Sequence, residues 1–187
     1  MSFLPNNLKI DIFSRDDIPK KKNLYCTHLF SITHPGNSQP PEGIDDFLSK
    51  PIVYKYNFHD VYSKQQLASK LYKVPSFDDV KSIVQAGEDI KLLVEHGEDI
   101  RIFFHCQAGI SRSTAAACII LNVIFGPGFE MQILQEIYQM RPIMNPNDLM
   151  ISLADNILNR NGVMINANKK AKTTLRNIYK GSPWILD

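Results

Sequence analysis

A cysteine and an arginine separated by five residues are the pair in this sequence best suited to chemistry. Cys106 and Arg112 enclose Gln107, Ala108, Gly109, Ile110 and Ser111. The run before them, Ile100–Phe104, is strand-like, and the run after them, Arg112–Phe125, is helix-like. A loop in this position can direct several backbone N–H groups, and the positive end of a helix dipole, at one anion. We therefore expect residues 106–112 to form an anion-binding loop.

The two side chains that end this loop suit an attack on a phosphate ester. The field that holds an anion also favours a thiolate over a thiol at Cys106. Arg112 offers a planar fork of donors that can hold two phosphate oxygens at once. A thiolate fixed in line beneath oxygens that are already held removes much of the barrier to attack on phosphorus. We expect Cys106 to be the nucleophile, Gly109 to allow the tight turn, and Ser111 to shape the loop.

The segment His105–Ser113, HCQAGISRS, resembles the His-Cys-x5-Arg-Ser/Thr signature of the cysteine-dependent protein tyrosine and dual-specificity phosphatases. A weaker similarity extends over roughly Ile10–Arg160. It is closest to the compact bacterial tyrosine-phosphatase-like proteins, through segments similar to SRDD, SIT-PG and RP-x-x-x-PN. The resemblance implies a hydrolase with a phosphocysteine intermediate. It also implies that Ser113 stabilises the departing thiolate and that His105 hydrogen-bonds the loop and tunes the cysteine.

A further acidic residue is needed, because the leaving oxygen of the ester must be protonated. The resemblance implies an aspartate upstream of the cysteine, and the candidates are Asp60, Asp78 and Asp79. Asp78 and Asp79 are also explained as first-turn residues that complement a helix dipole. We favour Asp60, which directly follows a predicted strand and can overhang the carboxyl edge of the sheet. His59 is an alternative proton carrier.

Asn147 lies in the segment RPIMNPN and resembles a family asparagine that braces the loop or the hydrolytic water. Helix initiation explains the same residue equally well.

Strands and helices alternate along the chain, which predicts an α/β fold. Apolar patterning predicts strands at Leu8–Phe13, Leu24–Thr33, Pro51–Phe58 and Arg101–Phe104. Helices are predicted after a Ser76–Asp79 capping box, at Arg112–Phe125, at Phe129–Met140, and after an Asn145 cap with Pro146 at the first helical position. We expect a mostly parallel central sheet with helices on both faces and the phosphate site at the carboxyl ends of the strands.

The chain is expected to contain one catalytic domain, residues 1–160, and a C-terminal extension, residues 161–187. Its 187 residues are 44% hydrophobic and 21% charged, which is enough apolar material for one sizeable core. The extension is predicted to be partly ordered and packed through Trp184. It carries the basic residues Lys169, Lys170, Lys172, Arg176 and Lys180. The segment Val61–Val74 fits a helix, a loop or a mobile flap.

The bulk properties argue against several classes of protein. A net charge of +2, without a Lys/Arg stripe interleaved with aromatics, does not suit nucleic acid. We find no secretory signal and no apolar run of roughly 20 residues that would span a membrane. Three unpatterned cysteines, Cys26, Cys106 and Cys118, indicate a reducing compartment. We expect a cytoplasmic monomer without a metal or other cofactor; a bacterial protein delivered into a host cell fits the same pattern.

The loop interior, QAGIS, carries no lysine, whereas phosphoinositide phosphatases of the resembled superfamily tend to have basic residues there. A phosphoprotein is therefore the expected substrate, with phosphotyrosine first. Dual specificity, an inositol phosphate and another small phosphomonoester stay open. The rival classes are a phosphate-binding module without turnover, which would lack Cys106 or Arg112, and a rhodanese-like sulfurtransferase, which the His-Cys-x5-Arg-Ser context disfavours.

Overall fold

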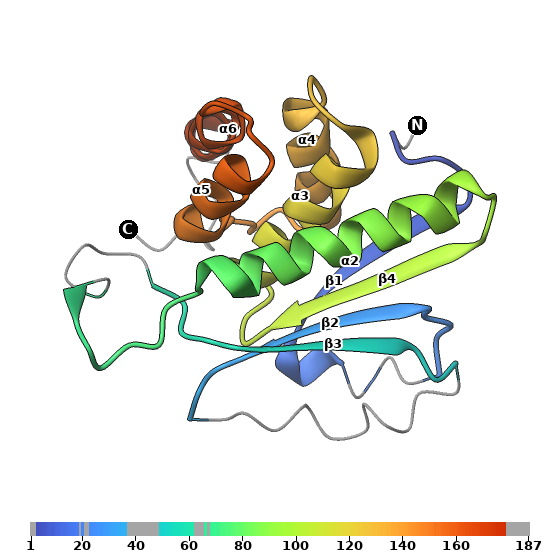
Figure 1. Cartoon of the computed structure of the whole chain (residues 1–187), viewed down its shortest axis with the longest axis horizontal. Coiled ribbons are helices and arrows are strands. Elements are labelled where there is room, and N and C mark those ends of the chain that lie inside the picture. The colour runs from blue at the N-terminus through green and yellow to red at the C-terminus, as the bar shows by residue number, and fades with distance from the viewer. Residues whose placement is uncertain are drawn as a thin grey trace.

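A parallel four-stranded sheet forms the centre of the molecule, in the order β1-β4-β2-β3 (Figure 1). The computed structural model describes residues 3–18, 20, 23–36, 49–61, 66 and 68–178. The strands are β1 (Leu8–Ser14), β2 (His28–Thr33), β3 (Ile52–Asn57) and β4 (Ile100–Cys106). β4 lies between β1 and β2, so its carboxyl end emerges from the interior of the sheet. The predicted fold class, a parallel sheet flanked by helices, is confirmed.

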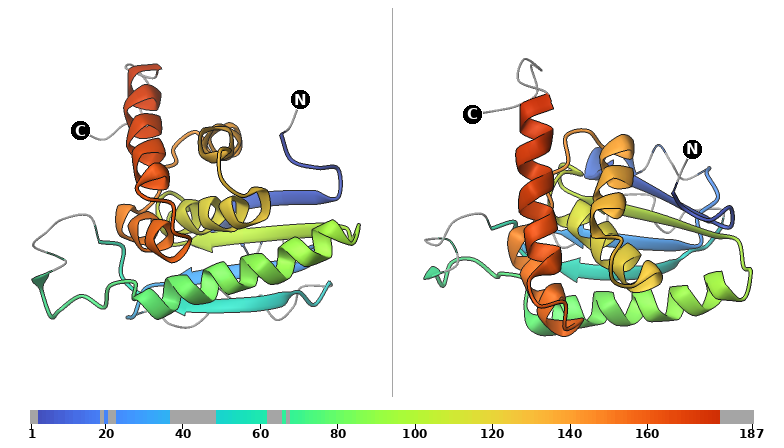
Figure 2. Two further views of the ribbon diagram at one scale, coloured as in Figure 1. Left: turned by 45° about the horizontal axis from the view of Figure 1, so that its top comes forward. Right: turned by 90° about the horizontal axis from the view of Figure 1, so that it is seen from above.

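The α-helices of the described ranges gather on one face of this sheet (Figures 1 and 2). They are α2 (Phe77–Glu95), α3 (Arg112–Phe125), α4 (Glu130–Met140), α5 (Asp148–Ile157) and α6 (Val163–Ile178). α2 and α3 contact the strands, and α4, α5 and α6 pack against these helices or against one another. A one-turn 3-10 helix, η1 (Arg15–Asp17), follows β1.

The prediction of helices on both faces is therefore wrong for the described ranges. Right-handed crossovers that run in opposite directions across a sheet lie on opposite faces. The path β1 to β2 to β3 runs one way, and the path from β3 back to β4, which contains α2, runs the other way. On the opposite face, Ile18 and Cys26 from the β1–β2 connection pack against Leu29 and Phe103.

The alternation of apolar residues along β4 explains how one strand serves both faces. Ile102 and Phe104 enter the main core beneath the helices, while Phe103 enters the smaller cluster behind the sheet. α3 is buried along nearly its whole length, as expected for a helix that is apolar on nearly all sides. β2 is shorter than predicted, because Leu24 and Tyr25 are exposed and the strand begins at His28.

Two helices, α2 and α5, begin at side-chain caps, and one of the two predicted caps needs correction. The Ser76–Asp79 capping box is confirmed: Ser76 Oγ accepts the Asp79 N–H at 3.1 Å, and Asp79 Oδ2 accepts the Ser76 N–H at 2.9 Å. The predicted Asn145 cap of α5 is wrong. Asn147 caps that helix through Oδ1, which accepts the Met150 N–H at 3.1 Å. The Asn145 N–H is donated to the Ile110 carbonyl instead.

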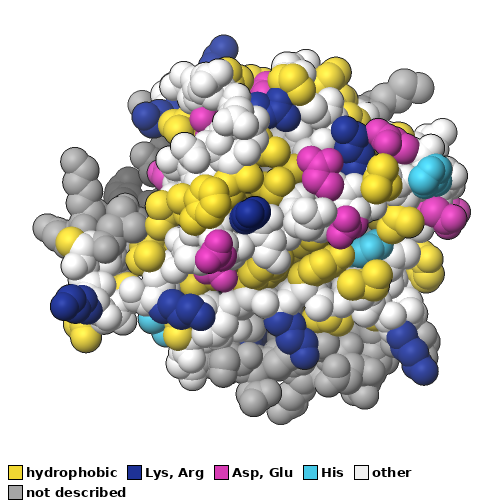
Figure 3. All heavy atoms as spheres, viewed as in Figure 1, with side chains coloured by type: hydrophobic (Ala, Val, Ile, Leu, Met, Phe, Trp, Pro, Cys, Tyr) yellow, Lys and Arg dark blue, Asp and Glu magenta, His cyan; other side chains and the backbone are white. Residues whose placement is uncertain are grey.

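The predicted C-terminal extension begins as an ordered helix. Met164, Ala167 and Ala171 of α6 are buried in the main core. Trp184 and Lys180 lie outside the described residues, as do residues 62–65 and 67 of the segment Val61–Val74. In the described ranges no helix is long and apolar enough to cross a membrane. On the face drawn in Figure 3, Lys and Arg side chains are interspersed with Asp and Glu.

Candidate active site

The cysteine loop leaves the sheet at the carboxyl end of β4, as predicted. Ser14 of β1 pairs with Cys106, and Ser31 of β2 pairs with the preceding residue, His105, so neighbouring strands support both sides of the loop's origin. Cys106 is only 1% exposed and lies at the base of the loop. Its Sγ is 3.2 Å from Oγ of Ser113, a fully buried residue in the first turn of α3. A hydroxyl at this distance can hydrogen-bond a thiolate.

The carbonyl groups of the loop are held from outside by hydrogen-bond donors. Arg141 Nη2 donates to the Ala108 carbonyl at 2.9 Å, and Arg141 Nε donates to the Gly109 carbonyl at 3.0 Å. The backbone N–H groups of Arg15, Asn145 and Asn147 donate to the carbonyls of Gln107, Ile110 and Ser111 at 3.1, 2.9 and 3.3 Å. We call Arg15, Arg141, Asn145 and Asn147 the carbonyl brace. It accounts for every carbonyl between the cysteine and the arginine.

The carbonyl brace determines where the N–H groups of the loop point. In a trans peptide the C=O and the following N–H lie on opposite sides, and the described chain contains no cis peptide. With the carbonyls of residues 107–111 held outward, the N–H groups of residues 108–112 face the inside of the loop. No acceptor in the described ranges is hydrogen-bonded to these N–H groups. The arrangement is a nest of donors suited to an anion.

Gly109 is required by both conformation and space. Its φ is +68°, in the left-handed region. A Cβ at this position would lie 2.6 Å from the Phe13 carbonyl carbon and oxygen. The loop therefore passes against the end of β1 in a way that only glycine permits.

Arg112 and Asp60 meet above the loop. Arg112 is 3% exposed, and its Nη1 donates to the Phe58 carbonyl at 2.9 Å. Its Nε lies 3.6 Å from Asp60 Oδ2. Asp60 Oδ1 accepts hydrogen bonds from Ser111 Oγ at 2.7 Å and from Asn147 Nδ2 at 2.8 Å. The structure thus brings the predicted acid, the predicted phosphate ligand and the predicted asparagine into one cluster.

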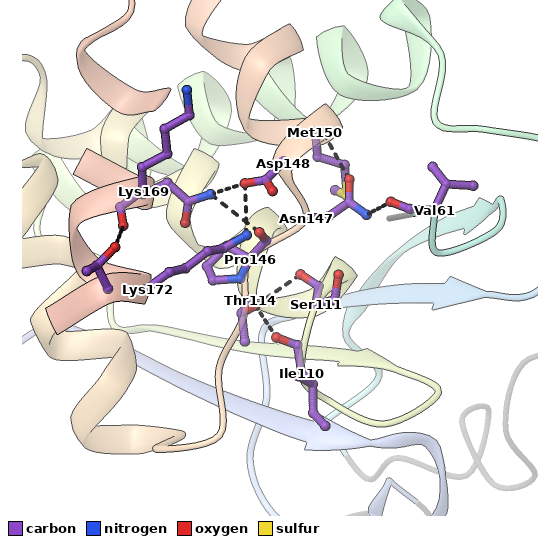
Figure 4. Close-up of polar contacts among 12 residues, drawn as sticks. Val61, Ile110, Ser111, Thr114, Pro146, Asn147, Asp148, Met150, Lys169 and Lys172 are labelled. Atoms are coloured by element: carbon purple, nitrogen blue, oxygen red, sulfur yellow. Dashed lines mark hydrogen bonds and ion pairs between the residues drawn. The ribbon is translucent and has the colours of Figure 1, made fainter. Parts of the chain in front are cut away.

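The side chain of Asn147 joins the segment that follows β3 to the start of α5 (Figure 4). Besides Asp60, its Nδ2 donates to the Val61 carbonyl at 3.2 Å, while its Oδ1 caps α5 through Met150. The side chain of Asn147 therefore initiates α5 and holds the Asp60–Val61 segment, while its contact to the cysteine loop is the backbone N–H that donates to the Ser111 carbonyl. On the far side of the same turn, Asn168 Nδ2 of α6 donates to Asp148 Oδ1 at 2.8 Å and to the Pro146 carbonyl at 3.4 Å.

The other acid candidates have different partners. Asp79 is engaged in the capping box with Ser76. Asp78 is exposed in the first turn of α2, and neither residue has a hydrogen bond or ion pair to the loop among the described contacts. His59 Nδ1 accepts the Lys73 N–H at 2.9 Å, and the described contacts include no hydrogen bond from its ring to the loop. The geometry favours Asp60 among these candidates.

His105 is fully buried on the face of the sheet opposite the main core. Its Nε2 is 2.8 Å from Ser31 Oγ, and burial lowers the pKa of its ring to about 4. His105 is therefore neutral at pH 7. Burial also raises the pKa of the Cys26 and Cys118 thiols to about 12, so neither is a thiolate at pH 7. No group of three or more His, Cys, Asp or Glu side chains in the described ranges is placed to hold a metal ion.

Sequence reasoning missed Arg141, the Asn145 N–H and the Phe58 carbonyl. The signal for Arg141 was present, because it opens the RPIMNPN segment in which Asn147 was singled out. The two backbone groups have no signal in residue type at all. Their roles come from the paths of β3 and the α4–α5 connection past the loop.

Comparison with known proteins places this geometry in a known fold. No protein-family model matches the chain, and no curated protein sequence is significantly similar to it. The Yvh1 phosphatase domain from Chaetomium thermophilum is similar in structure, with a TM-score of 0.53 and 14% identity over 87% of this chain and 96% of that chain. DUSP15 gives a TM-score of 0.50 and 20% identity over 97% of both chains. PTPMT1, solved in complex with PI(5)P, gives 0.52 and 9% identity over 89% of this chain and 94% of that chain. The chain therefore has the fold of the cysteine-dependent tyrosine and dual-specificity phosphatases.

Proposed function

We propose that this chain is a phosphomonoester hydrolase that acts through a phosphocysteine at Cys106, with phosphotyrosine in proteins as its first substrate. The observation that carries the proposal is the loop itself. All five carbonyls between Cys106 and Arg112 are held outward, so the N–H groups converge on the space in front of a buried thiol. A phosphate is the ligand that such a loop binds best, because its oxygens accept several N–H bonds and an arginine fork together.

The first half of the reaction transfers the phosphoryl group to sulfur. Loop N–H groups and Arg112 hold the non-bridging oxygens and stabilise the charge that develops on them. The Cys106 thiolate forms the S–P bond as the bond from phosphorus to the ester oxygen breaks. The proton of Asp60 passes to that oxygen, so the product leaves as a neutral phenol or alcohol.

The second half returns the cysteine to its starting state. Asp60, now a carboxylate, takes a proton from a water molecule that attacks phosphorus. The S–P bond breaks, inorganic phosphate leaves, and the Ser113 hydroxyl, 3.2 Å from Sγ, stabilises the released thiolate. The position of Asp60 supports its assignment, since Ser111 and Asn147 hold Oδ1 and its Oδ2 lies 3.6 Å from Arg112 Nε, beside the proposed phosphate site. His105 then acts indirectly, as a neutral residue beneath the loop.

The alternative functions differ in the ligand that binds and in whether that ligand is hydrolysed. One structural neighbour, at a TM-score of 0.50 and 16% identity, is a human tyrosine phosphatase-like serine/threonine/tyrosine-interacting protein, so the fold by itself does not establish turnover. Because PTPMT1 was solved in complex with PI(5)P, an inositol phosphate is the alternative substrate class. The presence of Cys106 at the base of the loop and of Arg112 beside Asp60 favours turnover, and the absence of lysine from QAGIS favours a phosphoprotein.

The deciding experiment compares wild type with Cys106→Ser on a generic aryl phosphate. Wild type should turn the ester over, with competitive inhibition by vanadate and no inhibition by EDTA. Cys106→Ser should lose turnover but keep oxyanion binding, because the loop N–H groups and Arg112 are unchanged. Activity that EDTA abolishes and a divalent metal restores would contradict the phosphocysteine mechanism. Sulfurtransfer from thiosulfate without phosphatase activity would favour the rhodanese-like alternative.

A further inference from the structure

Three aromatic side chains form a rim beside the cysteine loop. His34 follows β2, His59 follows β3, and Tyr72 lies in the segment that returns to His59. The ring centroids of His34 and His59 are 4.3 Å apart, and those of His59 and Tyr72 are 5.2 Å apart, both in edge-to-face geometry. None of the three is used in the proposed mechanism. We call them the aromatic rim.

The aromatic rim lies next to the phosphate ligand Arg112. His59 stands between Phe58, whose carbonyl accepts Arg112 Nη1 at 2.9 Å, and Asp60, whose Oδ2 is 3.6 Å from Arg112 Nε. Ser31 of β2 pairs with His105, so Ile32 is level with Cys106. His34 is two residues beyond that level, or about 7 Å along the strand direction. The rim therefore stands above the cysteine at the height of the group attached to a bound phosphate.

The backbone orients both histidine rings. His34 Nδ1 accepts the Gly36 N–H at 3.1 Å, and His59 Nδ1 accepts the Lys73 N–H at 2.9 Å. A ring nitrogen that accepts carries no proton, so the neutral ring of His34 is protonated at Nε2. Burial first, and then the neighbouring His59 and Arg112, lower the pKa of His34, which favours a neutral His34 ring at pH 7. Neutral imidazole presents a flat ring face rather than a cation.

The rim is open to a ligand. His34 is exposed, Tyr72 is 37% exposed, and His59 is half-buried between them. A phenyl ester places a flat ring one oxygen away from phosphorus, at the height of these side chains. A phosphoserine places only a methylene group there, which is too small to reach an aromatic face.

We infer that the aromatic rim of His34, His59 and Tyr72 contacts the phenyl ring of the substrate and selects aryl over alkyl phosphomonoesters. This inference rests on the proposed function. It derives the substrate class from side chains that lie outside the catalytic loop. Aromatic pairs contribute about 0.5–1.5 kcal/mol beyond simple burial. Loss of one rim ring should therefore lower kcat/KM for an aryl ester about 2- to 12-fold, chiefly through KM.

The test uses two peptides of identical sequence that carry either phosphotyrosine or phosphoserine. His34→Ala and Tyr72→Ala should each lower kcat/KM on the phosphotyrosine peptide by that factor. The phosphoserine peptide and the inhibition constant of vanadate should be unchanged. His34→Phe should restore the phosphotyrosine value, because it returns a flat ring without the imidazole nitrogens. His96→Ala is the matched control, an exposed histidine at the end of α2 that contacts neither the loop nor the rim.

Two results would overturn the inference. The first is an equal loss on both peptides. The second result has two parts: His34→Phe fails to restore activity, and the alanine variants lose activity selectively on a peptide that carries a second phosphate. The rim would then be an anion site. The same substitutions in the Cys106→Ser background, assayed by binding of both peptides, test the rim without turnover. An inactive wild type that still binds phosphotyrosine through the rim would contradict the hydrolase proposal alone.

Discussion

Arg141→Met separates the shape of the cysteine loop from its chemistry. Arg141 contacts no reacting atom in the proposed mechanism, yet its side chain holds the Ala108 and Gly109 carbonyls at 2.9 and 3.0 Å. Methionine keeps an unbranched apolar stem of similar width and removes both donors. The peptide groups at residues 108–110 would then be free to rotate, and their N–H groups would no longer be directed at the phosphate.

The size of the effect follows from the two hydrogen bonds. A hydrogen bond to a charged group contributes about 1.5–3 kcal/mol. Arg141 is half-buried, so water can partly replace it and the lower end of that range applies. Two bonds at the lower end amount to about 3 kcal/mol, which corresponds to roughly a 100-fold loss in kcat/KM. The same N–H groups bind vanadate, so its inhibition constant should rise by a comparable factor.

The assay is steady-state hydrolysis of an aryl phosphate together with vanadate inhibition. Arg101→Met is the matched control, because Arg101 is also half-buried and uses the same Nε and Nη2 atoms, here to Asp11 Oδ2 at 3.0 and 2.9 Å. That substitution should lower stability and leave kcat/KM and the vanadate constant near wild type. If Arg141→Met lowers stability alone, with both kinetic constants within twofold of wild type, the carbonyl brace does not organise the anion site.

Two further predictions concern the acid and the buried histidine. Asp60→Asn should slow hydrolysis of phenyl phosphate by roughly 10²–10⁴-fold and slow a nitrophenyl ester less, because a good leaving group needs no proton; Asp78→Asn and Asp79→Asn should mainly lower stability. Single-turnover kinetics on all three variants decides the assignment, which fails if the leaving-group dependence appears at residue 78 or 79. Because burial lowers the pKa of His105 from 6.5 to about 4, the unfolded chain binds a proton in that window that the folded chain does not. The free energy of unfolding should fall by about 2 kcal/mol between pH 7 and pH 5 from this group. Urea unfolding of wild type and His105→Gln at both pH values tests this, and equal pH dependence in the two proteins would contradict it.

Local sequence signals predicted the elements that deliver the site. The apolar run before Cys106 is β4, and the capping box at Ser76 starts α2, because both depend on neighbours in sequence. The face on which each helix packs is not a local property. It depends on the strand order β1-β4-β2-β3, which no periodicity in the chain encodes, and the prediction of helices on both faces failed at that point.

The same difference between local and non-local signals applies to the residues of the candidate site. Cys106, Gly109 and Arg112 were found because the loop is one continuous segment with a fixed spacing. The groups that hold it come from Arg15 before the loop and from residues 141–147 after it. Two of the main-chain donors belong to asparagines, but the donor is the backbone N–H, which every residue except proline possesses. Residue type therefore reveals the chemistry of this site more readily than its support.

The support also explains why the loop is ready to bind before any ligand arrives. N–H groups that face one another without acceptors are unfavourable, and a loop left to itself would rotate some of its carbonyls inward. Here each carbonyl already has a donor outside the loop, so inward rotation would break a hydrogen bond to Arg15, Arg141, Asn145 or Asn147. The unfavourable arrangement is thus maintained by the folding of η1 and the α4–α5 connection against the loop. In the proposed function a phosphate would accept these N–H groups without any rearrangement of the backbone, which is the condition under which donors stabilise a transition state most effectively.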